Sequence, residues 1–177
     1  FIKSSKEEFF CSVEPWLIPK NYELSNVSGV LNAVQVQSSL AGSVMITGAG
    51  AGGEPTASAV LADIVDFANR TKLLSFGRNS SKIKNNYKTN IYTEKFRFYL
   101  RLNVIDKSGV LASLTSIFRD NELSIESFIQ KSNHEDKTAE LVIITHEASK
   151  LMLDKALLSI NKLDGVISDP VCLSIYS

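Results

Sequence analysis

The stretch FRFYLRLNVIDKSGVLASLTSIF, residues 96–118, decides the fold of the second half of this 177-residue chain. Over residues 96–104 apolar side chains alternate with polar or amphipathic ones, which predicts a strand with one buried face. Apolar residues then recur at helical spacing, which predicts a helix. These are Val110, Leu111, Leu114, Ile117 and Phe118. The loop between the two patterns therefore joins a strand to the start of a helix.

The remainder of the second half continues this alternation of elements. Residues 124–132 and 138–148 are predicted strands joined by a polar turn at 133–137, and 166–175 is a final strand. A second helix precedes it and ends at Gly165. Its apolar face comprises Leu153, Ala156, Leu157, Ile160 and Leu163. The order βαββαβ predicts an α+β, ferredoxin-like fold, in which an antiparallel four-stranded sheet has both helices on one face.

The first half begins with a predicted strand over residues 1–18. Phe9, Cys11 and Val13 form its expected buried side. The only two cysteines, Cys11 and Cys172, lie far apart and lack the spacing of a disulfide framework or a metal site. Both are expected to be reduced, buried strand residues, which fits a cytoplasmic protein.

A hairpin and a helix follow. Residues 30–47 alternate as a hairpin with its turn at 41–42, and the run GAGAGG at 48–53 is expected to be irregular. Pro55 suits the first turn of a helix, where its missing N–H costs nothing. The apolar face of that helix comprises Ala57, Val60, Leu61, Ile64, Val65 and Ala68.

The glycine run also matches GxGxxG between a strand and a helix, the pattern of a dinucleotide-binding turn. No second strand ending in an acidic residue follows, so the run does not begin a Rossmann domain. Two interpretations remain open. Backbone N–H groups can approach an anionic ligand at a helix N-terminus, or the glycines only permit a tight turn with positive φ.

Composition excludes several functions. Residues 70–95 are basic and rich in Asn and Ser, and we interpret them as a solvated linker because no aromatic stacking platform accompanies the charges. Nineteen basic residues balance nineteen acidic ones, which favours neither nucleic acid nor an anionic membrane as a partner. No apolar run reaches the roughly 20 residues that span a bilayer. His134 and His146 lack partners at triad or metal spacing, so we expect no metal site and no histidine catalysis.

Three sequence blocks carry a resemblance. PWLIPK at 15–20, SGVLNAV at 28–34 and GAGAGGEPTASAV at 48–60 resemble, in order and spacing, the C-terminal part of the catalytic domain of homoserine dehydrogenases. The resemblance covers residues 8–69 and implies a nicotinamide cofactor, NAD or NADP, beside the glycine loop. The implied cofactor contacts are Gly52, Gly50 and Thr56. The catalytic residues of that family would lie upstream of Phe1, so none is assigned here and the chain alone is expected to be inactive.

Residues 96–177 resemble an ACT domain over their whole length. The resemblance rests on DKSGVL at 106–111 and on SIESFIQ at 124–130. It implies that an amino acid binds at an interface between two copies, near the N-terminus of a helix that can receive a carboxylate. The implied effector-binding residues are Asp106, Gly109, Val110 and Leu111.

Together the resemblances imply a C-terminal part of homoserine dehydrogenase with a catalytic-domain end at 1–69, a linker at 70–95 and a regulatory ACT domain at 96–177. The implied reaction is the NAD(P)-dependent interconversion of L-homoserine and L-aspartate 4-semialdehyde in threonine, methionine and isoleucine biosynthesis. Threonine would regulate a cytoplasmic homo-oligomer through the ACT domain. Control could pass along the linker or through direct domain contact. The alternatives are a stand-alone amino-acid-binding ACT module without catalytic activity and an ACT domain that only dimerises.

Overall fold

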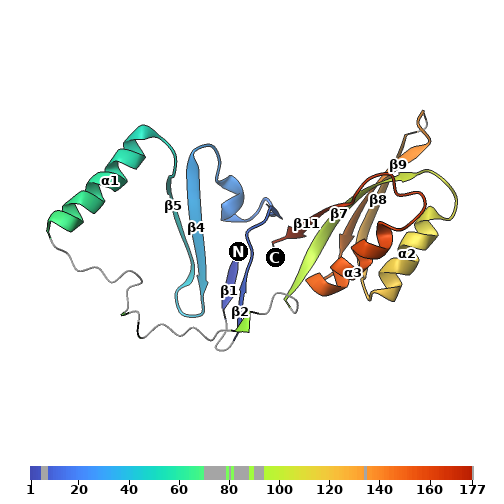
Figure 1. Ribbon diagram of the computed structural model, residues 1–177, viewed down its shortest axis with the longest axis horizontal. Coiled ribbons are helices and arrows are strands. Elements are labelled where there is room, and N and C mark those ends of the chain that lie inside the picture. The colour runs from blue at the N-terminus through green and yellow to red at the C-terminus, as the bar shows by residue number, and fades with distance from the viewer. Residues whose placement is uncertain are drawn as a thin grey trace. The chain divides into compact units, whose positions relative to one another are not determined.

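The computed structural model describes most of the chain in two compact units (Figure 1). The described residues are 1–4, 8–69, 79, 81, 88–89, 94–133 and 135–176. We call Phe1–Pro19 together with Tyr87–Ser177 the sheet unit, and Lys20–Asn86 the hairpin unit. Most of the expected linker, and His134, lie outside the described residues.

The sheet unit contains the predicted βαββαβ order. Its main elements are β7 (Lys95–Ile105), α2 (Val110–Asp120), β8 (Ile125–Asn133), β9 (Thr138–Thr145), α3 (Lys150–Ile160) and β11 (Val171–Ile175). The strands are hydrogen-bonded in the order β11-β7-β9-β8, and each of these pairs is antiparallel. The two-residue strand β10 (Ala148–Ser149) also pairs with β7. The predicted four-stranded sheet and the α+β fold class are confirmed.

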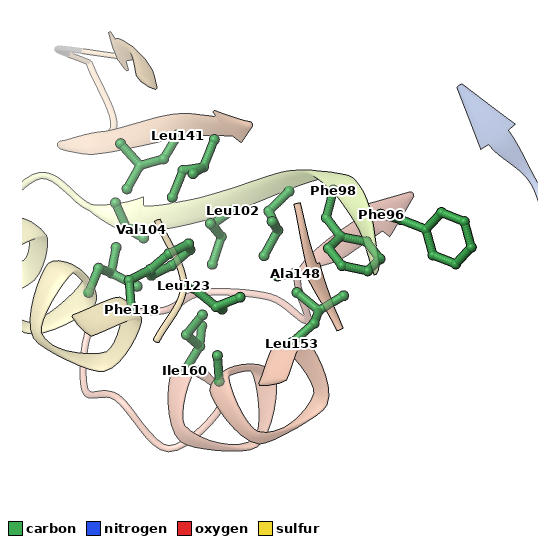
Figure 2. Packing of buried hydrophobic residues seen from close by; sticks show 14 of the residues in the cluster. Phe96, Phe98, Leu102, Val104, Phe118, Leu123, Leu141, Ala148, Leu153 and Ile160 are labelled. Carbon is green, nitrogen blue, oxygen red and sulfur yellow. The ribbon is translucent and has the colours of Figure 1, made fainter. Parts of the chain in front are cut away.

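Both helices of this unit cover the same face of the sheet (Figure 1). Figure 2 shows side chains of β7, such as Leu102 and Val104, directed toward Phe118 on α2 and toward Leu153 and Ile160 on α3. The apolar residues on the inner face of β7 are at most 8% exposed, namely Phe96, Phe98, Leu100, Leu102 and Val104. Since strand side chains alternate with a period of two, the pattern that predicted β7 also builds its buried face.

The first nineteen residues differ from expectation. The predicted single strand is three short ones: β1 (Ile2–Ser4), β2 (Glu8–Cys11) and β3 (Trp16–Leu17). β1 pairs with β2, which also pairs with β6 (Lys88–Thr89), and β3 runs parallel to β11 at the edge of the main sheet. The residues of 1–19 thus pack with the sheet unit.

The side of β2 that faces the core was predicted wrongly. Phe10 is buried, whereas Cys11 and Val13 are exposed. The physical reason is aromatic packing, since the ring of Phe10 lies 5.4 Å from the ring of Phe96, centroid to centroid. Cys172 is half-buried in β11, and both cysteines are free thiols.

The hairpin unit contains a 3-10 helix, η1 (Glu23–Asn26), strands β4 (Leu31–Ser38) and β5 (Gly42–Ala49), and helix α1 (Gly53–Ala68). The predicted hairpin is confirmed, with Val34 paired to Ile46. The glycine run is less irregular than expected, because β5 continues through Gly48 and Ala49 and α1 begins at Gly53. Backbone pairing explains the extension, since the N–H of Gly50 donates to the carbonyl of Val30 at 2.9 Å.

No described residue of the hairpin unit is buried. The apolar residues of α1 are between 53% and 87% exposed, namely Val60, Leu61, Ile64, Val65 and Phe67. Both faces of the β4-β5 hairpin are likewise largely open. No helix in the described part of the chain is long and apolar enough to cross a membrane.

Candidate functional site

The glycine loop at residues 50–52 connects β5 to α1. Gly52 is the N-cap of α1 and has φ 127°, a conformation that side-chain-bearing residues rarely adopt. A Cβ at Gly52 would lie 3.3 Å from Cδ of Pro55. Thr56 closes the loop, because its Oγ1 donates to the carbonyl of Gly52 at 2.8 Å and its backbone N–H donates to the same oxygen at 3.2 Å. Gly52 therefore has the positive φ that we expected if the glycines permit a tight turn.

A shallow, open depression of about 250 Å³ lies where the hairpin meets this loop. Its lining residues are Asn32, Ala33, Val34, Ile46, Thr47, Gly48, Ala49 and Gly50. Of the expected cofactor contacts, Gly50 lines the depression, while Gly52 and Thr56 lie just beyond it at the helix N-terminus. The arrangement places the backbone of Gly48 and Gly50, next to the side chain of Asn32, beside the positive end of a helix dipole, which suits an anionic ligand.

The expected effector loop lies at one end of the main sheet. Gly109, the N-cap of α2, has φ 96°. The loop is held by its backbone, because the N–H of Asp106 donates to the carbonyl of Lys137 at 2.8 Å and the N–H of Ile105 donates to that of Gly165 at 2.8 Å. Two other turns therefore meet at this loop.

The side chains of the expected effector loop differ in exposure. Asp106 is exposed, and its carboxylate has no hydrogen-bond partner among the described residues. Leu111 is 40% exposed, whereas Val110 packs against the core. No backbone acceptor in the described ranges pairs with the N–H groups of Leu111 and Ala112. Among the described residues, Leu111 and its neighbour Ala112 thus present unpaired backbone N–H groups, and Asp106 presents an unpaired carboxylate, near a helix N-terminus.

Outside these two loops, we considered the Cys172 thiol as a nucleophile and the acidic, cysteine and histidine side chains as metal ligands. Burial raises the pKa of the Cys172 thiol from 9.0 to about 11, with Lys150 opposing and Asp154 and Glu14 adding to the rise. A thiol with a raised pKa is a poor nucleophile near neutral pH. Within the described ranges no three His, Cys, Asp or Glu side chains are grouped so that they could hold a metal ion.

The sequence patterns missed a contact between the first residues and the main sheet. Trp16 lies edge-on to Phe96, with ring centroids 5.0 Å apart, and β3 pairs with Ser174 and Ile175 of β11. The N–H of Tyr176 donates to the carbonyl of Leu17 at 2.9 Å. The aromatic residues at both ends of the chain were the available signal, but their partners are about 80 or more residues away in sequence, and periodicity does not pair them.

Two family profiles match successive parts of the chain. The homoserine dehydrogenase family profile matches residues 2–65, and the ACT domain profile matches residues 98–165. The chain is 36% identical to the homoserine dehydrogenase of Neisseria gonorrhoeae over 162 residues, which are 87% of this chain and 37% of that protein. It is 34% identical to the enzyme of the same name from Pseudomonas aeruginosa, over 96% of this chain and 40% of that protein.

A solved structure agrees with these matches. The crystal structure of a homoserine dehydrogenase from Thiobacillus denitrificans covers 99% of this chain with a TM-score of 0.81 and 28% identity, and the match is 41% of that chain. The chain thus spans about two fifths of the length of the relatives that it matches, in their C-terminal part. The resemblance carried by the three sequence blocks and by DKSGVL is confirmed. The chain belongs to the homoserine dehydrogenase family and carries an ACT domain.

Proposed function

We propose that the chain forms the C-terminal part of a cytoplasmic homoserine dehydrogenase that interconverts L-homoserine and L-aspartate 4-semialdehyde with NAD or NADP. The observation that carries the proposal is the succession of both family profiles along one chain, with 34–36% identity to homoserine dehydrogenases over most of its length. Residues 1–69 end the catalytic domain, 70–95 link it and 96–177 regulate it. The catalytic residues belong to the remainder of the enzyme.

The glycine loop supplies the cofactor contact in this proposal. Gly52 and Gly50 let the backbone approach the nicotinamide cofactor, and Thr56 holds the loop through its bond to the Gly52 carbonyl. The test is Gly52→Ala in the complete enzyme, with Gly29→Ala as the control, because Gly29 also has a positive φ but lies outside the loop. Cofactor KM is expected to rise only for Gly52→Ala. If both variants raise the cofactor KM equally, the loop serves only as a turn. Homoserine-dependent turnover by the chain alone would contradict the proposal that the catalytic residues lie in the remainder of the enzyme.

The ACT domain binds an amino acid, with threonine favoured. The free N–H groups of Leu111 and Ala112 receive its carboxylate, and Asp106 offers an acceptor for its ammonium group. Gly109 permits the close approach, and Val110 and Leu111 flank it. The sheet face opposite the helices carries exposed Ile129 and Val171, an apolar surface that a second copy in a homo-oligomer would cover.

Calorimetric titration of threonine into the chain tests this site. Heat is expected with the native chain and is expected to fall sharply with Asp106→Ala, which removes an exposed carboxylate without a structural partner. Sedimentation of the same samples follows self-association, which must be linked to binding if the site lies between copies. Absence of heat at millimolar threonine would indicate an ACT domain that only dimerises. Heat with another amino acid would show that the site binds that amino acid instead of threonine.

In this proposal, threonine binding regulates catalysis through direct contact between the ACT domain and the end of the catalytic domain, rather than through the linker. β3 extends the sensing sheet as a further strand, and the side chains of Ser174 and Glu14 are joined at 3.3 Å. A change in the sheet therefore reaches residues 14–17, which the homoserine dehydrogenase profile includes. Trp16→Ala is expected to retain threonine heat in the complete enzyme while weakening inhibition. If threonine inhibits the Trp16→Ala enzyme as strongly as the native enzyme, the linker would be the favoured route of regulation. Such couplings are typically on the order of 1–3 kcal/mol.

A further inference from the structure

Within the hairpin, the side chain of Asn32 leaves little room for a side chain at Gly50. An ideal Cβ built on Gly50 would lie 1.7 Å from Nδ2 and 2.5 Å from Cγ of Asn32. Separations below 3.0 Å are far inside van der Waals contact, so the Asn32 side chain occupies the space that a side chain at position 50 would need. Any larger residue at 50 requires Asn32 or the loop to move.

Strand register explains the overlap. Asn32 pairs with Gly48 across the β4-β5 ladder, and side chains two residues apart on a strand share a face. Gly50 is therefore the diagonal neighbour of Asn32 on that face, within reach of a side chain of this length. Gly48 lies on the same face, yet nothing lies within 4 Å of the position that its Cβ would take. Gly48 in β5 and Gly50 in the loop thus meet different surroundings.

The contact lies where the loop leaves the ladder. The N–H of Gly50 is tied to the carbonyl of Val30, and two residues later Gly52 turns with positive φ into α1. Asn32 covers Gly50 from the side, so backbone and side chain together fix the last extended residue before the turn. Asn32 and Gly50 also line the same depression.

We propose that Asn32 is a positioning residue for the cofactor loop, and that residue 50 is glycine so that it leaves room for the Asn32 carboxamide as well as for the cofactor. The inference rests on the proposed function for the loop's role, but the packing pair stands on geometry alone. The carboxamide of Asn32 restricts the conformation of residues 50–52 before the cofactor binds. Such preorganisation lowers the free-energy cost of ordering the loop on binding. Loss of the pair therefore weakens cofactor binding without removing a reacting group.

The test is a double-mutant cycle in the complete enzyme that carries this chain. Gly50→Ala is expected to raise the KM for NADPH or NADH by about tenfold, which is within the range of coupling energies between residues in contact. Asn32→Ala removes Cγ and the amide that a Cβ at 50 would meet, so Asn32→Ala with Gly50→Ala is expected to recover most of that loss. Asn32→Ala alone is expected to have a smaller effect on the same KM, with kcat less changed.

A second readout does not depend on activity. Amide hydrogen exchange at residue 50 is expected to accelerate in Gly50→Ala and to return toward the native rate when Asn32→Ala is added. Gly48→Ala is the steric control and is expected to leave exchange at residue 50 unchanged, because its Cβ meets open space.

The outcomes separate the two claims. If Gly50→Ala is equally harmful with Asn or Ala at position 32, or harmless with both, the positioning role is wrong. If the native complete enzyme binds no nicotinamide cofactor in a fluorescence titration, the proposed function fails, and the exchange experiment still decides whether Asn32 holds Gly50.

Discussion

Helices α1 and α3 have similar apolar spacing but opposite surroundings. On α3, Leu153, Ala156 and Ile160 are fully buried, whereas on α1 the residues Val60 and Ile64 are more than half exposed. The difference lies in what stands opposite each helix, since α3 packs on β7 in the sheet unit, whereas the described residues of the hairpin unit do not bury α1. Periodicity shows which face requires a partner, and it does not show that the partner is present.

The strands repeat this contrast. β7 buries alternate side chains under two helices, while β4 and β5 leave Val34, Val36 and Ile46 more than half exposed. Stability of the chain should therefore reside in the sheet unit, because burial of apolar area is the dominant favourable term in folding. In the proposed enzyme, the remainder of the catalytic domain covers the hairpin unit.

The largest expected effect tests this division directly. Phe98→Ala removes a fully buried ring and should lower the free energy of unfolding by about 3–5 kcal/mol. Ile64→Ala, at a position that is 57% exposed, should change it by less than about 0.5 kcal/mol. Urea unfolding of the chain, followed by far-UV circular dichroism, which reports both units, measures both. A large loss with Ile64→Ala would show that the hairpin unit buries its own apolar face in solution.

The next effect concerns the first residues, which pack with the sheet unit. Trp16 is half-buried against Phe96, and Trp16→Ala should destabilise the unit by about 2 kcal/mol through lost burial and an edge-to-face ring contact. Phe67, which is 87% exposed on α1, provides the aromatic control, and Phe67→Ala should have almost no effect. Thermal unfolding followed by circular dichroism compares the two variants. Equal melting temperatures would mean that β3 does not stabilise the sheet.

The sequence was sufficient for the sheet unit because local patterns and long-range packing agree there. The alternation of Phe96 to Val104 and the helical spacing of Leu114 and Phe118 describe faces that meet in one core. It failed for residues 1–18, where apolar residues occur on both sides of β2. The rings of Phe96 and Phe1 pack against Phe10 and select it over Cys11, and the alternation within the strand does not contain that choice.

For the candidate site, the sequence predicted the loops but not the groups that shape them. Gly109 and Gly52 do begin helices, as the spacing indicated. The dependence of Gly50 on Asn32 arises from strand register, which a single residue's identity does not reveal. The carbonyls of Lys137 and Gly165 that hold the effector loop likewise come from turns far along the chain.

A pair of glycines extends the comparison to the backbone. Gly165 in the sheet unit has φ 111°, and its Cβ would lie 3.1 Å from Cγ2 of Val110. Gly165→Ala should therefore cost about 1–2 kcal/mol. Gly48→Ala in the hairpin unit meets open space without a positive φ and should change stability by less than about 0.5 kcal/mol. Urea midpoints distinguish them, and a loss with Gly48→Ala as large as that with Gly165→Ala would contradict the steric account.

The smallest expected effect is a pH dependence that belongs to the sheet unit, because residues 20–86 contain no cysteine. Burial raises the pKa of Cys172 from 9.0 to about 11. Below pH 9 the thiol is protonated in both folded and unfolded chains, so its contribution to stability is constant. Between pH 9 and about 11 the unfolded chain releases the proton first, and stability is lost as pH rises. Tyrosines ionise in the same range, so the measurement is the difference between the native chain and Cys172→Ala in urea unfolding. The native chain should lose more stability than the variant above pH 9, and parallel curves would show that the thiol is solvated like an exposed one.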